Sequence, residues 1–251
     1  MRFALKRRMR IDISELSPAF PDFRVAVLVA EDLRIMDDRP AALASLIASR
    51  EADARSRWAG QELGEIPGIL AWRLAYKAFG IKKTSYRCSV ERLVKNALAE
   101  RPQPQINSFV DAYNAVSLTH VFPIGADDLD LVSGDLAFRY SRDGDSFVDM
   151  ASNDEAGGEA ILTEDPPKPG EVVYADANHV LCRRWNWRQD ARTLVSKATR
   201  RAVLTIQSNG IGDLDAAIVD VSDLITRFSG GRVHVTIADA TRPIVALAGT
   251  V

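Results

Sequence analysis

Residues 182–193, CRRWNWRQDART, hold two tryptophans, an asparagine and four arginines directly after an apolar segment typical of a β-strand. An ordinary core does not accept so many guanidinium groups, and ordinary surfaces seldom carry two indole rings so close together. A guanidinium offers a planar fork of donors and an indole offers a stacking face, so the stretch indicates a site for a planar or anionic ligand. The alternative is a structural cluster in which Trp185 and Trp187 pack against a sheet while the arginines form ion pairs.

Around this stretch, hydrophobic periodicity predicts helices mainly in the first half of the chain and strands mainly in the second. Helices are predicted at 39–58, from Ile69 to a stop at Gly80, from an N-cap at Ser89, at 106–118 and at 213–228. Strands are predicted at 11–14, 24–30, 135–141, 171–174, 180–182, 202–206 and 233–238, with a hairpin turn at 142–145 and a polar loop at 152–158. Because helices and strands mix without a regular βαβ alternation, the pattern favours an α+β fold over a doubly wound sheet.

Composition allows a sizeable core in a chain of 251 residues, of which 47% are hydrophobic and 26% charged. A formal net charge of −2 excludes a histone-like polycation. The charge is uneven, because basic residues dominate 183–201 and acidic residues dominate 126–176. A basic band beside an acidic one steers a polyanion into a defined pose, or the two bands pair with each other.

The N-terminal residues, the length of the apolar runs and the cysteines indicate the cellular compartment that we expect for the protein. Residues 1–10 are basic and are expected to form an N-terminal extension, either an arm that touches RNA or an acidic surface or an over-called start before Met9, with one domain at 11–251. No apolar run approaches the roughly 20 residues that span a bilayer, so no membrane partner is expected. Cys88 and Cys182 lie far apart in the sequence and are read as free thiols in the cytoplasm.

Known cofactor and catalytic signatures are missing from the sequence. There is no Walker loop, no GxGxxG after a strand, no GxSxG and no HExxH motif. The histidines are scattered and the cysteines have no metal-binding spacing, so we expect neither a metal nor another cofactor. Four polar residues have side chains suited to chemistry on an ester, and each also fits a helix cap or turn: Asp111, Asn114, Asp128 and Asp176.

Several segments together resemble the B3/B4 domain, which occurs in the β subunit of bacterial phenylalanyl-tRNA synthetase and in free-standing proteins. The segments are INSFVDAYNAVSL, a Pro-x-Gly loop, DDLD, GDLAFRYSRDGDSF, PGEVVYAD and CRRWNWRQDARTLVSKATRRAVL. INSFVDAYN is similar to the synthetase pattern I-N-x-V-V-D-x-T-N, whereas the Arg/Trp stretch is similar to the free-standing group. The resemblance spans about Ile69 to Val235 and implies a mixed or antiparallel sheet core with flanking helices in a single domain.

In the synthetase this domain hydrolyses the ester bond that links a wrongly attached tyrosine to tRNA-Phe. Its pocket uses a Thr-Asn pair, a His, a Gly-rich turn and a Glu that recognises the tyrosine hydroxyl. The resemblance places these at Tyr113-Asn114, near Gly125, near 183–186 and near Thr205, so only Asn114 is retained. Without an anionic acceptor at Thr205, selection of tyrosine is not expected. Ester hydrolysis itself is still compatible with a positioned water.

The resemblance implies a trans-acting hydrolase that edits mischarged aminoacyl-tRNA. The alternative is a non-catalytic module that binds tRNA or a small carboxylate or amino-acid-like ligand; the sequence predicts no oligomeric state. Asn114 and Asp176 are the expected catalytic residues. We expect one pocket for the substrate and a separate basic surface for tRNA, formed respectively by Ser117, Arg184, Trp185, Asn186 and Arg188, and by Arg192, Lys197, Arg200 and Arg201.

Overall fold

Strand β2 (Phe23–Glu31) runs through the centre of the molecule, because its apolar residues are buried on both faces of a sheet. The computed structural model describes residues 8–81, 86–151 and 161–250. β2 belongs to a four-stranded antiparallel sheet in the order β11-β2-β10-β3, in which the other strands are β3 (Ile124–Asp128), β10 (Ala202–Asn209) and β11 (Arg232–Ala238).

A six-stranded sheet in the order β12-β1-β4-β7-β8-β9 packs against it, and one parallel pair, β1 with β4, makes this second sheet mixed. Its strands are β1 (Arg10–Asp12), β4 (Leu136–Tyr140), β7 (Val172–Ala175), β8 (Val180–Arg183), β9 (Arg188–Gln189) and β12 (Ile244–Ala246). A separate pair consists of β5 (Val148–Ala151) and β6 (Ile161–Glu164).

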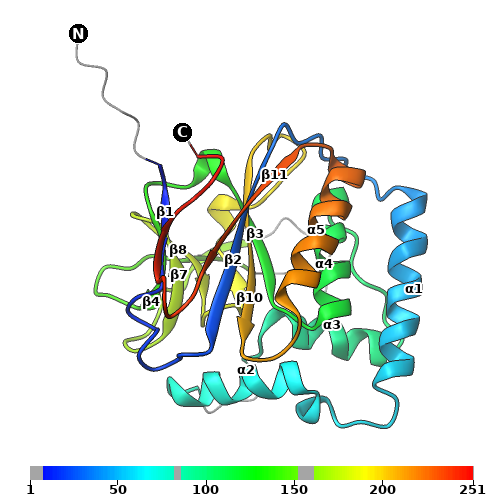
Figure 1. The fold of residues 1–251 in the computed structure, drawn as a ribbon, viewed down its shortest axis with the longest axis horizontal. Coiled ribbons are helices and arrows are strands. Elements are labelled where there is room, and N and C mark those ends of the chain that lie inside the picture. The colour runs from blue at the N-terminus through cyan, green and yellow to red at the C-terminus, as the bar shows by residue number, and fades with distance from the viewer. Residues whose placement is uncertain (1–7, 82–85, 152–160, 251) are drawn as a thin grey trace.

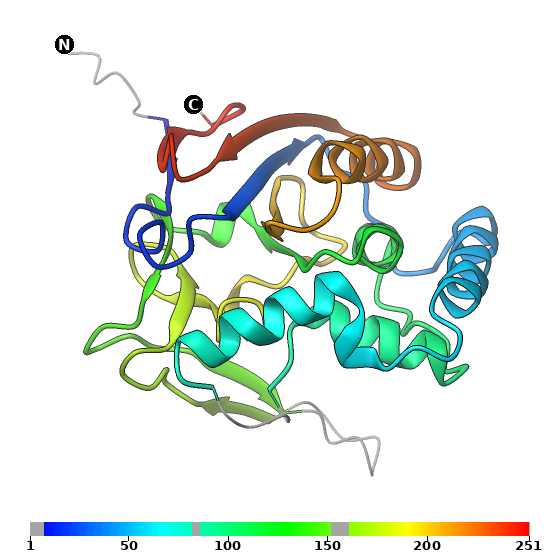
Figure 2. The ribbon, with the colours of Figure 1, turned by 60° about the horizontal axis from the view of Figure 1, so that its bottom comes forward.

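Helices cover the other face of the four-stranded sheet. α4 (Ser108–His120) and α5 (Leu214–Ser229) pack side by side on that face, and α1 (Ala41–Arg57) lies outside α4 (Figures 1 and 2). α2 (Pro67–Ala78) crosses near the ends of β2 and β10, and α3 (Ser89–Leu98) packs against α1 and α4. The sheets and helices therefore form successive layers, which confirms the α+β class.

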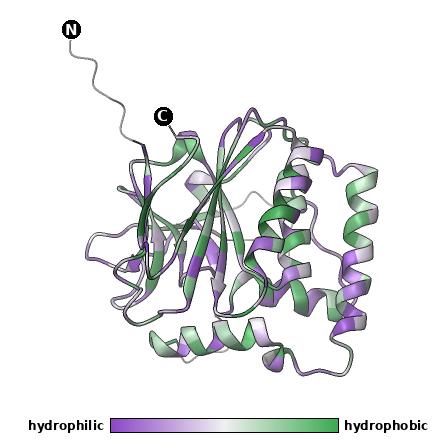
Figure 3. Cartoon of the chain, viewed as in Figure 1, coloured by the Kyte–Doolittle hydropathy of each residue, from purple (hydrophilic) through white to green (hydrophobic). Residues whose placement is uncertain are grey.

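The alternation of side chains along β2 divides the core into two parts. Val25, Val27 and Val29 face the six-stranded sheet and α2, whereas Ala26 and Leu28 face α4 and α5. Figure 3 shows hydrophobic residues along the strands and inner helices, while the outer helix α1 alternates between hydrophilic and hydrophobic residues. The space between the two sheets is thus one apolar core, and polar groups inside it need a specific explanation.

The start of α4 shows how buried polar groups are satisfied. Asn107 is its N-cap, and the side-chain oxygen accepts hydrogen bonds from the backbone N–H groups of Phe109 and Val110. One turn later, the fully buried Asp111 pairs with Arg39 at 2.7 Å and accepts a bond from the backbone N–H of Ile106. Asp111, one of the four polar residues considered for ester chemistry, is therefore fixed in a structural ion pair.

Two local predictions are wrong. The turn at 142–145 forms, but the strands on either side of it do not pair: β4 pairs with β7, and β5 pairs with β6. Local turn chemistry is thus overridden by long-range pairing. The N-cap of α3 is Cys88 rather than Ser89, and no side chain caps that helix. The predicted loop at 152–158 and most of the predicted extension at 1–10 lie outside the described residues; Arg10 already belongs to β1.

The turn between β8 and β9 carries Trp185 into the core between the sheets. Arg184 and Trp185 both have left-handed backbones, with φ of 47° and 69°, which non-glycine residues rarely adopt. Trp185 is fully buried, and its indole packs against four aromatic rings at centroid distances of 4.7–6.1 Å: Phe20, Phe23, Trp72 and Phe79. This packing stabilises a turn that would otherwise be strained by about 1–3 kcal/mol per residue.

Replacing this indole should therefore destabilise the whole domain. Trp185→Ala is expected to lower the free energy of unfolding by about 3–5 kcal/mol, because it removes a large buried side chain and leaves a cavity. Trp187→Ala, two residues along at a partly exposed position, is the matched control and should have a smaller effect. Urea denaturation of both variants measures the difference, and equal losses would contradict the structural role of Trp185.

Candidate functional site

A cavity of about 70 Å³ lies between the two sheets beside the edge strand β3. Strands β3 and β10 form one wall, β7 and β8 form another, and the turn after β8 together with the start of α3 closes it. The residues that line it are Ser89, Ile124, Gly125, Ala126, Asp127, Tyr174, Leu181, Cys182, Asn186, Trp187, Gln189, Thr205 and Gln207. Among these, Asp127 alone carries a charged side chain.

The register of β3 with β10 explains why polar residues meet here. Thr205 lies directly opposite Gly125, and Asp127 and Gln207 follow two residues further along their strands, so all four share one face. A Cβ atom added to Gly125 would meet no atom within 4 Å, so this glycine leaves open space beside Thr205. The cavity exists where a side chain is missing from an otherwise packed interface.

Asp127 is the one carboxyl group among the lining residues, and its pKa is strongly raised. One carboxylate oxygen, Oδ1, accepts hydrogen bonds from Thr193 at 2.7 Å and from Gln189 at 2.9 Å. No donor among the described residues reaches the other oxygen, Oδ2. Burial raises the pKa of Asp127 to about 7, and the charges of Asp190 and Asp176 act in the same direction. A carboxyl with a pKa near neutrality and a free oxygen is suited to proton transfer.

A chain of hydrogen bonds forms another part of the wall. The hydroxyl of Tyr76 donates to Asn186 at 2.9 Å, the amide of Asn186 donates to Gln207 at 3.0 Å, and the amide of Gln207 donates to Thr205 at 3.2 Å. All four side chains are buried. The chain locks Asn186 and Gln207 in place, and it ends at a hydroxyl that faces the cavity.

Tyr174 supplies a polar group that has no partner. Its ring stacks on Phe138 with centroids 4.6 Å apart, and its buried hydroxyl makes no hydrogen bond with the described residues. Burial raises the pKa of Tyr174 well above its ordinary value, so the phenol keeps its proton. A buried hydroxyl without a partner is unfavourable by about 1–3 kcal/mol, which makes this position unusual.

The residues of the Arg/Trp stretch that were expected to form the substrate pocket lie in different places. Asn186 lines the cavity as expected, while Trp185 lies in the aromatic core. Arg184 is buried between two rings, with its guanidinium carbon 3.7 Å from the centroid of Tyr86 and 4.2 Å from that of Trp187. No Arg or Lys is therefore among the described lining residues of the cavity.

The other arginines of this stretch form ion pairs, and Arg184 itself lies 3.3 Å from a carboxylate oxygen of Glu171. Arg183 is fully buried and donates to Glu171 at 2.7 Å, with Asp165 on its other side. Arg188 pairs with Asp149 and lies 4.6 Å from the centroid of Trp187. These charges are neutralised by acidic residues in β5 and next to the ends of β6 and β7, a pairing that the sequence alone does not reveal.

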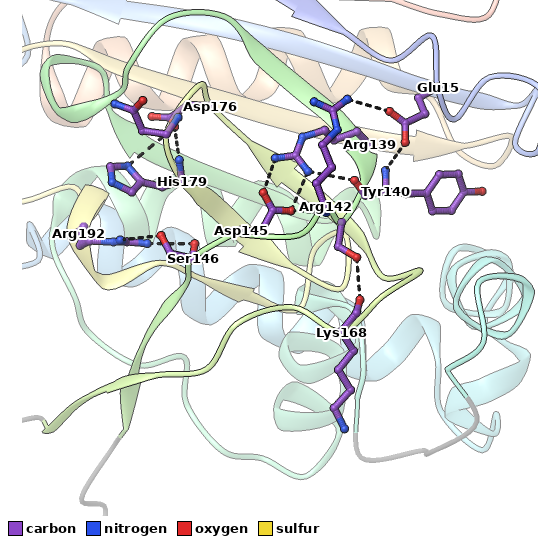
Figure 4. A network of polar contacts seen from close by, with 12 residues as sticks. Glu15, Arg139, Tyr140, Arg142, Asp145, Ser146, Lys168, Asp176, His179 and Arg192 are labelled. Carbon is purple, nitrogen blue, oxygen red and sulfur yellow. Dashed lines mark hydrogen bonds and ion pairs between the residues drawn. The ribbon is translucent and has the colours of Figure 1, made fainter.

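The two expected catalytic residues and Ser117 lie outside the described lining of the cavity. Asp176 has a fully buried carboxylate that accepts three backbone N–H bonds, from Ser133, Asn178 and His179. Asp176 and His179 lie side by side in Figure 4. Ser117 donates to the carbonyl of Phe122 at 2.6 Å. Asn114 is half-buried on α4. Their catalytic or binding roles stay predictions, and the contacts of Asp176 and Ser117 are those of structural residues.

The four basic residues expected to bind tRNA lie in or next to the segment that leads into β10. Arg192 donates to Asp190 at 2.6 Å and contacts Ser146 (Figure 4), and Lys197 pairs with Asp37 at 2.8 Å. Arg201 pairs with Asp130 and Glu31. Arg200 is exposed, and its described hydrogen bonds go to the backbone carbonyls of Lys197 and Thr199. Arg200 is thus the one whose charge has no acidic partner among the described contacts.

Sequence reasoning missed Asp127, Tyr174, Gln189 and Gln207. Asp127 was overlooked because it lies within an acidic run beside Asp128, and only the strand register shows which of the two faces inward. Asp128 instead accepts bonds from Thr199 and the backbone of Asp130. Strict alternation along β3 would have placed Gly125 and Asp127 on one face of the strand. It would not have shown which face of the strand is buried.

Two kinds of site are absent from the described residues. No group of three or more His, Cys, Asp or Glu side chains there is arranged to hold a metal ion. No described helix has the length and apolar character needed to cross a membrane.

The raised pKa of Asp127 makes stability depend on pH. The folded protein keeps this proton up to about pH 7, whereas an unfolded aspartate, with a pKa of 3.8, releases it. Folding therefore loses stability as pH rises from about 4 to 7 and levels off above that. Asp127→Asn cannot ionise, so its unfolding free energy should decline less over this range; denaturant titrations at several pH values measure this. Parallel curves for the two proteins would show that Asp127 ionises normally.

Comparison with known proteins places the chain in a family. The model of the B3/4 domain matches residues 71–212, more than half of the chain and within the segment that the sequence predicted. No curated protein matches. A solved N-terminal fragment of the phenylalanyl-tRNA synthetase β-subunit from Pyrococcus horikoshii aligns with 93% of this chain at 11% identity and a TM-score of 0.45. This chain spans about half of that fragment, 52%. The match over residues 71–212 shows that the chain belongs to the B3/4 domain family.

Proposed function

We propose that this chain is a hydrolase that removes a small, wrongly attached amino acid from tRNA, acting in trans. The observation that carries the proposal is the cavity itself. It lies between Gly125, Thr205 and Asn186, which the resemblance aligns with the editing pocket of the synthetase, and its lining includes Asp127, whose Oδ2 has no donor among the described residues. The location and the chemistry of the cavity therefore agree.

Asp127 is proposed as the general base. Its Oδ2 would accept a proton from a water while the water oxygen bonds to the ester carbonyl carbon. The ester C–O bond then breaks, the proton passes to the departing ribose oxygen, and free tRNA and the amino acid result. A pKa of about 7 leaves a large fraction of Asp127 ionised near neutrality while keeping it basic enough for the transfer.

The size of the cavity supports a small amino acid. An engineered cavity of about 150 Å³ holds a benzene ring, and this one has about half that volume. A small side chain therefore matches the cavity better than the ring of tyrosine does. The loss of the family Glu at Thr205 acts in the same direction, since no carboxylate is present there to accept a bond from a phenol.

Asp176 and Asn114 also have proposed roles, although neither is among the described lining residues of the cavity. Asp176 would act through Asp127, because its charge helps to raise the pKa of that group. Asp176→Ala also removes the acceptor of three backbone N–H bonds, so thermal melts must accompany its kinetics. The role proposed for Asn114 rests on the resemblance.

A second candidate function is a non-catalytic module that binds tRNA or an amino-acid-like ligand. The observation in its favour is the closed chain from Tyr76 to Thr205, whose amide groups bond each other rather than an oxyanion. In that case Asp127 would bind part of a ligand without transferring a proton.

Deacylation of a panel of mischarged tRNAs tests the proposal. The protein should cleave at least one ester with a small amino acid faster than spontaneous hydrolysis, and Tyr-tRNA-Phe poorly. Asp127→Asn should reduce the rate about 100-fold or more, the contribution usual for a general base. Asp143→Asn, an exposed aspartate in a turn, is the matched control and should act like the unaltered protein. Absence of turnover on every substrate would leave the binding module as the function.

Binding of tRNA should depend on salt. Lysine and arginine side chains displace counterions from phosphates, so affinity falls steeply with rising ionic strength. The charge reversals Lys197→Glu and Arg200→Glu together should weaken binding to all tRNAs alike. Arg227→Glu with Arg232→Glu is the matched control, since it also reverses two exposed cations of which one has an acidic partner. Filter binding at dilute and physiological salt measures both, and equal affinities would place the tRNA elsewhere.

A further inference from the structure

Tyr174 and Thr205 line the same small cavity, and each carries a hydroxyl group. We infer that they recognise the hydroxyl of a serine-sized side chain, so that seryl esters are preferred to alanyl esters. This inference rests on the proposed function and names its substrate class. It is built from the contacts of the two residues, the direction of the hydrogen-bond chain and the volume of the cavity.

Tyr174 is prepared to donate a hydrogen bond. Its side chain is buried to 3% exposure, and its hydroxyl has no partner among the described residues. The stacking on Phe138 fixes the ring, so the hydroxyl cannot turn towards solvent. Because the phenol keeps its proton, a guest that offers an oxygen would satisfy a donor that is otherwise left unpaired.

Thr205 provides a second donor, because the hydrogen-bond chain that ends at its hydroxyl uses the oxygen as an acceptor. Tyr76 donates to Asn186, Asn186 to Gln207 and Gln207 to the oxygen of Thr205. The hydroxyl oxygen of Thr205 thus acts as an acceptor towards Gln207, and its own hydrogen has no acceptor among the described hydrogen bonds. The cavity consequently offers donors from two strands, β7 and β10.

A hydroxyl group fits this set better than a methyl group does. Its oxygen accepts bonds from Tyr174 and Thr205, and its hydrogen has the open Oδ2 of Asp127 as an acceptor. Oδ2 has two lone-pair directions, so a guest hydroxyl and the attacking water can share it. A methyl group of the same size would leave both donors without a partner, and sites built to bind a hydroxyl reject such analogues. The volume of about 70 Å³ matches a few heavy atoms better than an aromatic ring.

The experiment compares seryl-tRNA and alanyl-tRNA as substrates. The unaltered protein should cleave the seryl ester with a kcat/KM about 10- to 100-fold higher, the effect of one or two satisfied buried donors. Tyr174→Phe removes a hydroxyl that bonds to no described residue, so the melting temperature should be unchanged. It should reduce the seryl rate about 10-fold more than the alanyl rate. Tyr140→Phe, on the neighbouring strand β4 and outside the lining, is the control and should keep the preference.

A binding measurement separates this inference from the proposed hydrolysis. Adenosine carrying a seryl or alanyl group through a stable 3′-amide is titrated into the unaltered protein and into Tyr174→Phe. The inference predicts tighter binding of the seryl compound to the unaltered protein only, even if no ester is cleaved. Equal binding of the two compounds, or a seryl preference that survives in Tyr174→Phe, would overturn it. Turnover of alanyl and seryl esters at equal rates would overturn it while leaving the hydrolase intact.

Discussion

The burial of Trp185 is the constraint on which the site depends. The turn after β8 has two consecutive left-handed residues without a glycine, and the indole at its tip is surrounded by the rings of Phe20, Phe23 and Trp72. Packing of such a large apolar group is worth several kcal/mol and offsets the backbone strain. The same turn then directs Asn186 into the cavity and Trp187 along its wall. One core contact thus sets the geometry of several polar groups.

The cavity is the gap that remains where the two sheets do not fill the space between them. Gly125 contributes no side chain, and the polar residues around it are fixed by each other rather than by solvent. Low polarity around Asp127 raises its pKa, and the same environment leaves the hydroxyl of Tyr174 without a partner. Such unsatisfied groups are unfavourable for folding, and they are typical of sites where a ligand completes the network.

The sequence predicted the fold class, most helices and strands, and the family, because hydrophobic periodicity and the B3/4 motifs are local. It assigned the Arg/Trp stretch to ligand binding, since composition cannot show that Glu171 and Asp149 on other segments pair with Arg183 and Arg188. It missed Asp127 because the choice between two adjacent aspartates depends on which face of β3 is buried. Site residues whose positions depend on the pairing register of distant strands could therefore not be predicted from the sequence.

The pH dependence of single-turnover deacylation is the most direct measurement of the central claim, that Asp127 in the cavity takes a proton from water. With the spontaneous rate subtracted, the rate for a seryl ester should rise with pH and level off above about 7, because only the ionised carboxylate is active. Asp127→Asn should lack this step. An enzyme-dependent rate that has the same profile in Asp127→Asn, or that follows the spontaneous reaction without levelling off, would contradict the account.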